Sequence, residues 1–452
     1  MFESDAISPI DGRYRSKLAE LANYFSEGAL NKYRIIVEGE YLITLAKHPK
    51  ISLRKFTKVE TDLIRSLYEP DQKSIEKIKE IEKTTNHDVK AIEYYLKERL
   101  GNTSLKKELE WIHFALTSED TNNLAYGLMI SEAIKDVMVP ALGKLTATIN
   151  ALAKKNKDAV MLARTHGQSA SPTTMGKELK IFCVRLEKQI DELKKYKIFV
   201  KLNGATGNYN AHLVAFQNVN WPKFSKDFIA ELAKLRGVKL SVNLITAQIE
   251  PHDTYAEIFD NLRRINTISI DFDQDIWRYI SDGWIKQKPV AGEVGSSTMP
   301  HKINPIDFEN SEGNLGIANA LCTYLSTKLP ISRLQRDLSD STVERNFGVV
   351  FAHSLLAYKS TMKGLGKIEV NKVKLLADLQ SHPEILAEAL QVIFRKEGLA
   401  SPYEKMKELT RGKEVGKDQI DEFIDSLEIS DDLKKNLKKI TPETYIGLAK
   451  KL

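Results

Sequence analysis

Long apolar stripes at helical spacing run through the middle of the chain and limit the folds that it can adopt. In the first stripe, apolar residues follow one another at steps of three or four: Met175, Leu179, Phe182, Leu186, Ile190 and Leu193. A second stripe extends from Ile258 to Ile280, and a third from Leu124 to Leu152. This spacing is typical of helices that pack one apolar side against other helices.

Patterns of alternating residues, which would indicate strands, are scarce beside these stripes. Residues 161–166 and 239–245 are short strand candidates, and neither repeats in a sheet-like rhythm. Stripes of such length need partners on more than one side. The sequence therefore predicts an all-α fold with a bundle of long central helices, and it favours self-association of the chain.

Prolines mark irregular points in this helical pattern. Pro140 interrupts the third stripe and should kink that helix, because it lacks a backbone donor and crowds the preceding turn. Pro305 could occupy the first position of a helix that continues to about Leu329. A further helix is expected from Thr342 to about Leu365.

The residue composition and the helical pattern change twice along the chain, which predicts three domains. Residues 1–111 are mixed helical and polar, residues 112–365 carry the long stripes, and residues 366–452 are rich in Lys and Glu with short broken helices. We therefore expect an N-terminal helical domain, a central long-helix bundle domain and a C-terminal helical domain.

Composition excludes several classes of protein. Among 452 residues, 67 Lys and Arg oppose 61 Asp and Glu, and a net charge of +6 spread over this length argues against a nucleic-acid binder. Cys183 and Cys322 lie in apolar helical runs, which predicts buried reduced thiols and excludes a disulfide framework or a cysteine-based zinc site. No apolar run approaches the roughly 18 residues of a membrane helix, and the N-terminus lacks a secretory pattern. We expect a soluble, cytoplasmic protein.

The most unusual polar segment is residues 292–305, GEVGSSTMPHKINP. Gly292 and Gly295 permit backbone geometries that other residues avoid. The segment also offers three hydroxyls, the charge of Lys302 and the amide of Asn304 just before a helix start. The amides of a Gly-Ser-Ser turn beside a lysine favour an anion. The alternative, an ordinary surface loop, explains the combination less well.

A second polar segment, residues 164–174, contains His166 in what we interpret as a short loop between long helices. Loops held by a rigid scaffold often carry catalytic groups. The spacing alone leaves a catalytic role and a structural role for His166 as equal alternatives.

Two further segments contain residues that are typical of helix starts. In residues 84–90, the His87-Asp88 pair could be an oriented imidazole, but Thr85, Asn86 and Asp88 are good capping residues and the cap interpretation leads. Residues 117–120 should begin the helix that contains Leu124, and their hydroxyls and free amides could also hold a carboxylate.

A last segment, residues 332–346, contains two arginines ahead of a Ser-Thr helix start, which suits a phosphate. By itself, a salt-bridged turn between helices is the better interpretation. The chain has no Walker loop and no Gly-x-Gly-x-x-Gly, and its histidines do not fall at metal-ligand spacing with a carboxylate partner. The sequence therefore indicates neither a metal nor a nucleotide cofactor.

The sequence GSSTMPHKINP resembles the signature of the fumarase/aspartase superfamily. Seven other segments are similar to motifs of the adenylosuccinate lyase family, in its enterobacterial-type bacterial branch: SPIDGRY, TTNHDVKAIEYYLKE, FALTSEDTNN, ARTHGQ, NGATGNYNAH, QIEPHD and SRLQRDLSDSTVERN. Their order and spacing agree over nearly the whole chain. One departure is GQSASPTT where the family commonly has GQPATPTT, and we expect Ser169 and Ser171 to make that loop less stiff.

The resemblance implies a three-domain, all-α subunit in a homotetramer whose active sites are shared between subunits. It implies the release of fumarate from adenylosuccinate, which gives AMP, and from succinylaminoimidazole-carboxamide ribotide (SAICAR), which gives the carboxamide AICAR. The implied partners are these small molecules, without nucleic acid, membrane, metal or cofactor.

The resemblance also assigns roles to individual residues. Ser296 is implied as the general base and His166 as the general acid. The implied phosphate contacts are Arg13, Tyr14, Arg336, Ser341 and Arg345, and the intervening Thr342, Val343 and Glu344 belong to the same binding run. Asn86, His87 and Asp88 are implied near the base ring. The groups implied around the succinyl carboxylates and their neighbours are Thr117, Ser118, Gln248, Ser297, Lys302, Ile303, Asn304 and Asn310.

Two other functions are weighed against this one. A sister lyase that acts on argininosuccinate, aspartate or malate would use the same chemistry, but the DGRY, NHD and QIEPHD segments favour the purine substrate. A helical scaffold without activity would keep the fold, but the presence of Ser296, Lys302 and His166 argues against it.

Overall fold

The computed structural model describes residues 5–292, 298–411 and 415–451, and the chain divides into two compact units. Unit 1 comprises Met1–Gly143, Gln189–Thr267 and Gly313–Tyr358, and unit 2 comprises Lys144–Lys188, Ile268–Glu312 and Lys359–Leu452. Helices dominate, and no strand of the described residues is longer than seven residues. The predicted all-α class is confirmed. The predicted boundaries of three domains stay a prediction.

Unit 1 is built mostly from short and medium helices. They are α1 (Ala19–Phe25), α2 (Glu27–Lys47), α3 (Lys58–Arg65), α4 (Gln72–Thr85), α5 (Asp88–Leu100), α6 (Ser118–Ala133), α9 (Asn210–Ala215), α10 (Trp221–Arg236) and α13 (Ser339–Glu344). The 3-10 helices are η2 (Arg15–Lys17), η3 (Ser66–Tyr68) and η4 (Lys106–Trp111). Strands β3 (Ile198–Val200) and β4 (Leu240–Val242) pair in parallel, so the strand candidate at residues 239–245 is confirmed in its first half.

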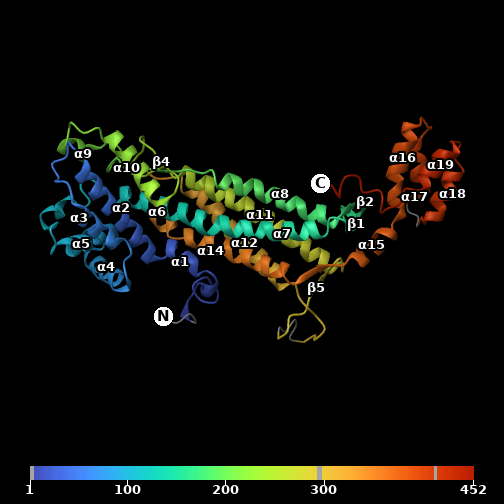
Figure 1. Ribbon diagram of the computed structural model, residues 1–452, viewed down its shortest axis with the longest axis horizontal. Coiled ribbons are helices and arrows are strands. Elements are labelled where there is room, and N and C mark those ends of the chain that lie inside the picture. Colours follow the sequence, from blue (N-terminus) through green and yellow to red (C-terminus); the bar gives the residue numbers. More distant parts are fainter. Residues whose placement is uncertain (1–4, 293–297, 412–414, 452) are drawn as a thin grey trace. The chain divides into compact units, whose positions relative to one another are not determined.

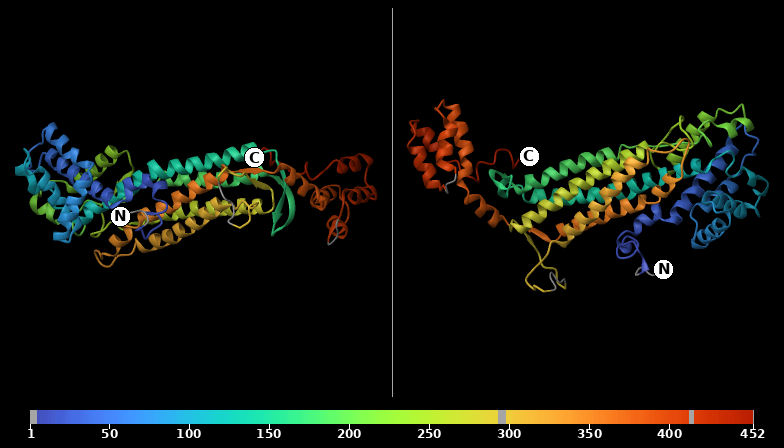
Figure 2. Two further views of the ribbon diagram at one scale, coloured as in Figure 1. Left: turned by 90° about the horizontal axis from the view of Figure 1, so that it is seen from below. Right: turned by 180° about the vertical axis from the view of Figure 1, so that it is seen from behind.

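Five long helices include those that carry most of the apolar stripes, and their residues are divided between the two units (Figures 1 and 2). They are α7 (Val139–Lys155), α8 (Met175–Leu193), α11 (Asp253–Ser281), α12 (Ile306–Lys328) and α14 (Phe347–Leu365). The apolar stripes pack between them as the sequence predicts. In unit 2 the rings of Phe182 and Phe272 lie 5.2 Å apart, and in unit 1 those of Phe259 and Phe351 lie 6.2 Å apart.

The irregularity predicted at Pro140 takes a definite form. Residues Ile134–Met138 form a π-helix, η5, directly between α6 and α7. Pro140 has no N–H to offer the preceding turn, and a wider turn accommodates the missing hydrogen bond. Both cysteines are buried and free, as expected.

Unit 2 adds two antiparallel strand pairs and a group of C-terminal helices. The pairs are β1 (Val160–Thr165) with β2 (Gln168–Thr174), and β5 (Ile285–Gln287) with β6 (Ile368–Val370). The helices are η6 (Pro383–Ile385), α15 (Lys372–Gln380), α16 (Leu386–Lys396), α17 (Pro402–Thr410), α18 (Lys417–Asp425) and α19 (Asp431–Lys438). Leu390, Phe394, Ile420 and Ile424 belong to a core that joins α16 to α18. Over the described residues, no helix combines the length and apolar character needed to span a bilayer.

Candidate functional site

His166 lies at the tip of a β-hairpin in unit 2. Thr165 of β1 pairs with Gln168 of β2, so His166 and Gly167 form a two-residue turn. Both have left-handed backbones, with φ of 53° and 74°, which is the geometry that matches the twist of a two-residue hairpin. The His166 side chain is exposed. The strand candidate at residues 161–166 is confirmed, but residues 168–174, which we interpreted as part of a loop, form the second strand.

The two serines that depart from the family pattern are held in this strand. Ser169 Oγ lies 3.3 Å from His382 Nδ1, and the hydroxyl of Ser171 donates to the carboxylate of Glu388. The expectation that these serines loosen a loop is therefore wrong. Their hydroxyls tie β2 to residues near η6 and α16 of the same unit, which restrains the hairpin below His166.

In unit 1, His87 is a helix cap whose ring also reaches another segment. Asn86 ends α4 in the left-handed conformation, with φ of 47°, and His87 is the N-cap of α5. His87 Nδ1 accepts a 3.1 Å hydrogen bond from the Lys90 amide. Because Nδ1 is an acceptor, the neutral ring carries its proton on Nε2, which lies 3.3 Å from Ser118 Oγ. The cap interpretation is confirmed, with His87 itself as the cap in place of Thr85, Asn86 or Asp88.

Ser118 reaches His87 because it occupies the first turn of α6. Thr117 is the N-cap of this helix, and its amide donates to Asp120 Oδ2 at 3.0 Å in a capping box. The predicted helix start at residues 117–120 is confirmed. The start of α6 and the start of α5 are distant in the sequence but meet through His87 and Ser118.

Two arginines share the carboxylate of Asp88 at the start of α5. Arg34 Nη2 lies 2.6 Å from Asp88 Oδ2, and Arg345 Nη2 lies 3.0 Å from the same oxygen. Arg345 also pairs with Glu27 at 3.2 Å. Burial opposes the charge of Asp88, but the two guanidinium groups outweigh it and lower the pKa of this carboxyl. A cavity of about 140 Å³ beside the pair is lined by residues that include Glu27, Glu344 and Arg345.

Arg336 lies between two buried carboxylates. Its Nη2 is 3.2 Å from Glu119 Oε2, and its Nε is 3.4 Å from Asp340 Oδ2. Burial raises the pKa of Glu119, and the charge of the Arg336 guanidinium opposes this shift. Residues 332–346 allow two interpretations, and the structure shows ion-paired arginines, as the interpretation of a salt-bridged turn predicts.

His252 completes this buried cluster. It is stacked on Tyr255, with ring centroids 5.3 Å apart, and its Nε2 lies 3.8 Å from Glu344 Oε1. Burial first, and then the charge of Arg336, lower the pKa of His252 to about 3, so its ring is neutral. Ligand atoms of Glu119, His252 and Asp340 lie within 4.8 Å of one another, a spacing that could hold a cation. The Arg336 guanidinium already forms ion pairs with both carboxylates, so it supplies the positive charge that a cation would otherwise bring.

Sequence reasoning missed Arg34, Glu119, His252 and Asp340. Arg34 lies inside the apolar helix α2 and is 1% exposed. A charged residue within a helix that is otherwise apolar is a signal of a buried partner. Glu119 and Asp340 each stand directly beside a predicted site residue, Ser118 and Ser341, so their position in the sequence was a second available signal.

The remaining predicted residues of unit 1 lie as follows. Arg13 and Tyr14 precede η2, and the Arg13 guanidinium carbon lies 5.9 Å from the Tyr14 ring centre. Gln248 donates through Nε2 to the Ala205 carbonyl at 3.2 Å. Ser341, Thr342, Val343 and Glu344 form part of α13, where the Ser341 amide donates to Asp340 Oδ1 at 2.6 Å.

In unit 2, the structure describes only part of the segment at residues 292–305. Ser296 and Ser297 lie outside the described residues. Lys302 is exposed, and its amide donates to the Met299 carbonyl at 3.1 Å. Gln287 Nε2 donates to the Ile303 carbonyl at 2.7 Å. Asn304 and Pro305 directly precede α12, which begins at Ile306, and Asn310 lies in its second turn.

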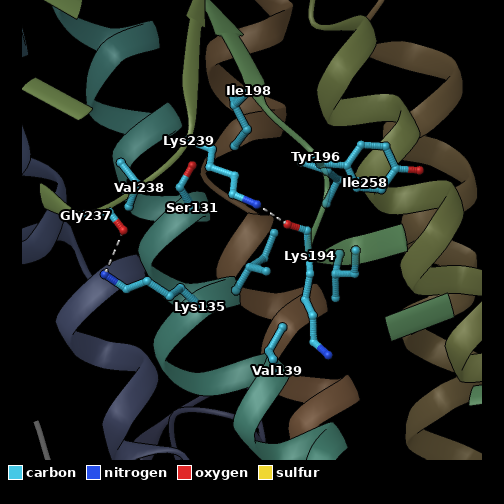
Figure 3. Close-up of a pocket in the computed structure, with 12 residues that line it drawn as sticks. Ser131, Lys135, Val139, Lys194, Tyr196, Ile198, Gly237, Val238, Lys239 and Ile258 are labelled. Carbon is cyan, nitrogen blue, oxygen red and sulfur yellow. Dashed lines mark hydrogen bonds between the residues drawn. The ribbon is translucent and has the colours of Figure 1, made fainter. Parts of the chain in front are cut away.

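Figure 3 shows a different cavity in unit 1, with a volume of about 260 Å³. It lies beside the π-helix, and apolar side chains such as Val139, Ile198 and Ile258 line it. The ammonium groups of Lys135 and Lys239 turn to the carbonyls of Gly237 and Lys194, at 3.4 and 2.9 Å. None of the predicted site residues lines this cavity.

Comparisons with known proteins agree with the predicted resemblance. The family described as "Lyase" matches residues 12–319, and the family described as "Adenylosuccinate lyase C-terminal" matches residues 332–446. The chain is 51% identical to an adenylosuccinate lyase of Haemophilus influenzae, over 99% of this chain and 97% of that protein. It is 48% identical to an adenylosuccinate lyase of Escherichia coli, over 98% and 97%.

Solved structures show the same fold at low identity. A 3-carboxy-cis,cis-muconate lactonizing enzyme from Pseudomonas putida has a TM-score of 0.73 and 18% identity, with 97% of this chain and 96% of that chain covered. A fumarate lyase from Mesorhizobium has a TM-score of 0.73 and 17% identity, with 96% of each chain covered.

Proposed function

Because this chain belongs to the adenylosuccinate lyase family, we propose that it releases fumarate from adenylosuccinate, which leaves AMP, and from SAICAR, which leaves AICAR. The observation that carries this proposal is 51% identity to an adenylosuccinate lyase over 99% of the chain. The C-terminal match at residues 332–446 adds to it, because that family is described by the same activity.

The reaction needs a base and an acid. A proton must leave the carbon beside a carboxylate, and its electron pair must form the double bond of fumarate while the C–N bond breaks. The departing nitrogen is a poor leaving group unless it receives a proton. Ser296 takes the carbon-bound proton in this proposal, and His166 gives a proton to the nitrogen.

Ser296 is a weak base in water and needs help from its surroundings. Backbone amides of the glycine-rich segment, together with the charge of Lys302, would favour its alkoxide in a site closed to solvent. The same positive charge would stabilise the doubly charged carboxylate of the carbanion. His166 suits the acid role because an imidazole can both carry and release a proton near neutral pH.

Unit 1 would hold the nucleotide part of the substrate. Arg336 and Arg345 each pair with a carboxylate oxygen, and a phosphate oxygen uses the same guanidinium donors. His87, with Nε2 as donor to Ser118 Oγ, would present a polar edge to the base or the succinyl group. Arg13, Tyr14, Asn86, Asp88, Thr117, Gln248 and the run Ser341–Arg345 complete the proposed binding set.

The proposal extends to assembly and location. We expect a homotetramer in the cytoplasm, with active sites composed of residues from more than one subunit, and with the three domains bounded as the sequence predicts. It also requires no metal or cofactor, because the serine, the histidine and the lysine supply the proton transfers and the charge.

A substrate assay tests the function. Purified protein should release fumarate from adenylosuccinate, followed by ultraviolet absorbance, and leave argininosuccinate, aspartate and malate unchanged. Activity on argininosuccinate alone would assign the chain to a sister lyase. Absence of activity on every one of these substrates would favour the scaffold.

A further inference from the structure

We infer that Glu119 and Asp340 are positioning residues that hold the Arg336 guanidinium ready for the substrate phosphate. The inference rests on the proposed function, because it takes Arg336 to be a phosphate contact. It goes further by naming two carboxylates that would not touch the substrate and would act through the arginine.

The two carboxylates are direct neighbours in the chain of proposed substrate contacts. Glu119 directly follows Ser118 in the first turn of α6, and Asp340 directly precedes Ser341 in α13. Arg336 contacts both, at 3.2 Å from Glu119 Oε2 and 3.4 Å from Asp340 Oδ2. One guanidinium therefore joins two segments that are distant in sequence and that each carry proposed substrate contacts.

The arginine and its two carboxylate partners differ in exposure. Glu119 is 0% exposed and Asp340 is 2% exposed, whereas the side chain of Arg336 retains 14%. A guanidinium has five N–H donors in a fixed plane. Because its two carboxylate partners are buried while part of the Arg336 side chain stays exposed, the guanidinium can face a ligand.

Among the described residues, Glu119 is held by its ion pair with Arg336 and accepts no hydrogen bond through its side chain. Both of its carboxylate oxygens are buried without a donor in hydrogen-bond geometry. Lys201, whose charge also acts on Glu119, pairs with Asp120 at 2.9 Å. Arg336 forms the ion pair with Glu119 at 3.2 Å, and breaking a buried ion pair is costly. Arg336 is therefore restrained beside Glu119, and a restrained arginine binds an anion at a smaller loss of side-chain freedom.

His252 closes the inner side of the cluster. Its ring is 0% exposed and is stacked on Tyr255 within 9° of parallel. Glu119 and Glu344 are themselves 0% and 2% exposed. Because ion pairs are stronger where water is excluded, this burial strengthens the hold on Arg336.

The experiment compares product inhibition in variants of the full-length protein. AMP carries the phosphate and fumarate does not, so their inhibition constants separate the two halves of the site. Glu119→Met removes the carboxylate at similar volume. We expect the inhibition constant of AMP to rise at least about tenfold, with that of fumarate changed less than about twofold.

A double-mutant cycle tests whether Glu119 acts through Arg336. Arg336→Ala should also weaken AMP inhibition, and adding Glu119→Met to it should change nothing further. Glu132→Met is the matched control, because Glu132 is another buried glutamate paired with an arginine, at 2.6 Å from Arg236. It should lower the melting temperature and leave both inhibition constants unchanged.

Several results would overturn the inference. These are an unchanged AMP constant in Glu119→Met or in Arg336→Ala, equal losses for AMP and fumarate, or additive effects in the double mutant. If Glu119→Met does not fold, Asp340→Asn carries the same expectation for AMP. A wild-type protein that releases no fumarate from adenylosuccinate would instead contradict the proposed function, and its AMP binding, measured by calorimetry in the same variants, would still test the pairing.

Discussion

The side chains of His87 and Ser118 meet with 3.3 Å between Nε2 and Oγ, although 31 residues separate them in the chain. The other ring nitrogen of His87 caps α5 through the Lys90 amide. One imidazole therefore has a structural bond on one side and faces a proposed substrate contact on the other. The sequence left these two roles as alternatives, and the geometry makes them compatible.

The two roles of His87 can be separated by substitution. His87→Ala removes the cap and should cost about 1 kcal/mol of unfolding free energy as well as activity. His87→Asn keeps a side-chain acceptor for the cap but is too short to reach Ser118 in the same way. It should retain stability in urea denaturation while kcat/KM falls. Equal losses of stability in both variants would show that the cap does not depend on the acceptor.

The proposed base and acid should be needed for turnover and not for folding. Ser296→Ala and His166→Ala should each lower kcat by about 10²–10⁴-fold. His166 is exposed at the hairpin tip, so its loss should leave the melting temperature unchanged. His48→Ala, at the C-terminal cap of α2, serves as the control histidine and should keep full turnover. Near-normal turnover in either test variant would show that the substituted residue is not the proposed base or acid.

Shared active sites predict complementation. When Ser296→Ala and His166→Ala proteins are mixed under conditions that permit subunit exchange, some sites should regain both groups, and activity should return. Exchange can be verified independently by mass spectrometry of labelled subunits. Absence of recovered activity despite verified exchange would contradict a site composed of residues from several subunits.

The carboxylate of Asp88 should be a large contributor to stability. Asp88→Asn removes the negative charge from Arg34, which is 1% exposed and bonded to it at 2.6 Å. Leaving a buried guanidinium without its counter-charge should cost about 3–5 kcal/mol in urea denaturation. Glu69→Gln breaks a pair of similar length, 2.7 Å to Lys32, but Glu69 is 73% exposed and the loss should stay below about 1 kcal/mol. If both variants lost a similar amount of unfolding free energy, the buried ion pair would not be more stabilising than the exposed one.

Asp273 should make the stability of the protein fall as the pH rises. Burial raises the pKa of Asp273 to about 8, although Ser311 and Thr361 oppose this shift through hydrogen bonds, the latter at 3.0 Å. An unfolded Asp titrates near pH 4. Between about pH 4 and pH 8 the folded chain therefore binds more protons than the unfolded chain, and stability declines across that window.

Asp273→Asn should remove this decline. The variant and the wild type should differ little near pH 4, and the variant should melt at a higher temperature near pH 8. Asp62→Asn, at an exposed position on α3, is the control and should follow the wild-type curve. Parallel curves for Asp273→Asn and wild type would mean that Asp273 does not keep its proton in the folded protein.

Parts of the fold and of the site followed from local patterns. The apolar stripes, the irregularity at Pro140, the helix after Pro305 and the start of α6 at Ser118 were all predicted, because each depends on neighbouring residues along one helix. Strand β2 was missed, since its serines and proline do not favour a strand. Pairing with β1 and hydrogen bonds to distant residues hold it in place.

The sequence by itself determined the helical class, the family and the residues that carry the proposed chemistry. The order of the motifs and the spacing of apolar residues depend only on the order of residues in the chain. Only the tertiary structure decided that Arg34 and Arg345 share Asp88, that Glu119 faces Arg336, and that His252 lies buried behind them. These pairings join residues from different helices. Their energies depend on distance and on exclusion from water, which exist only after the helices have packed.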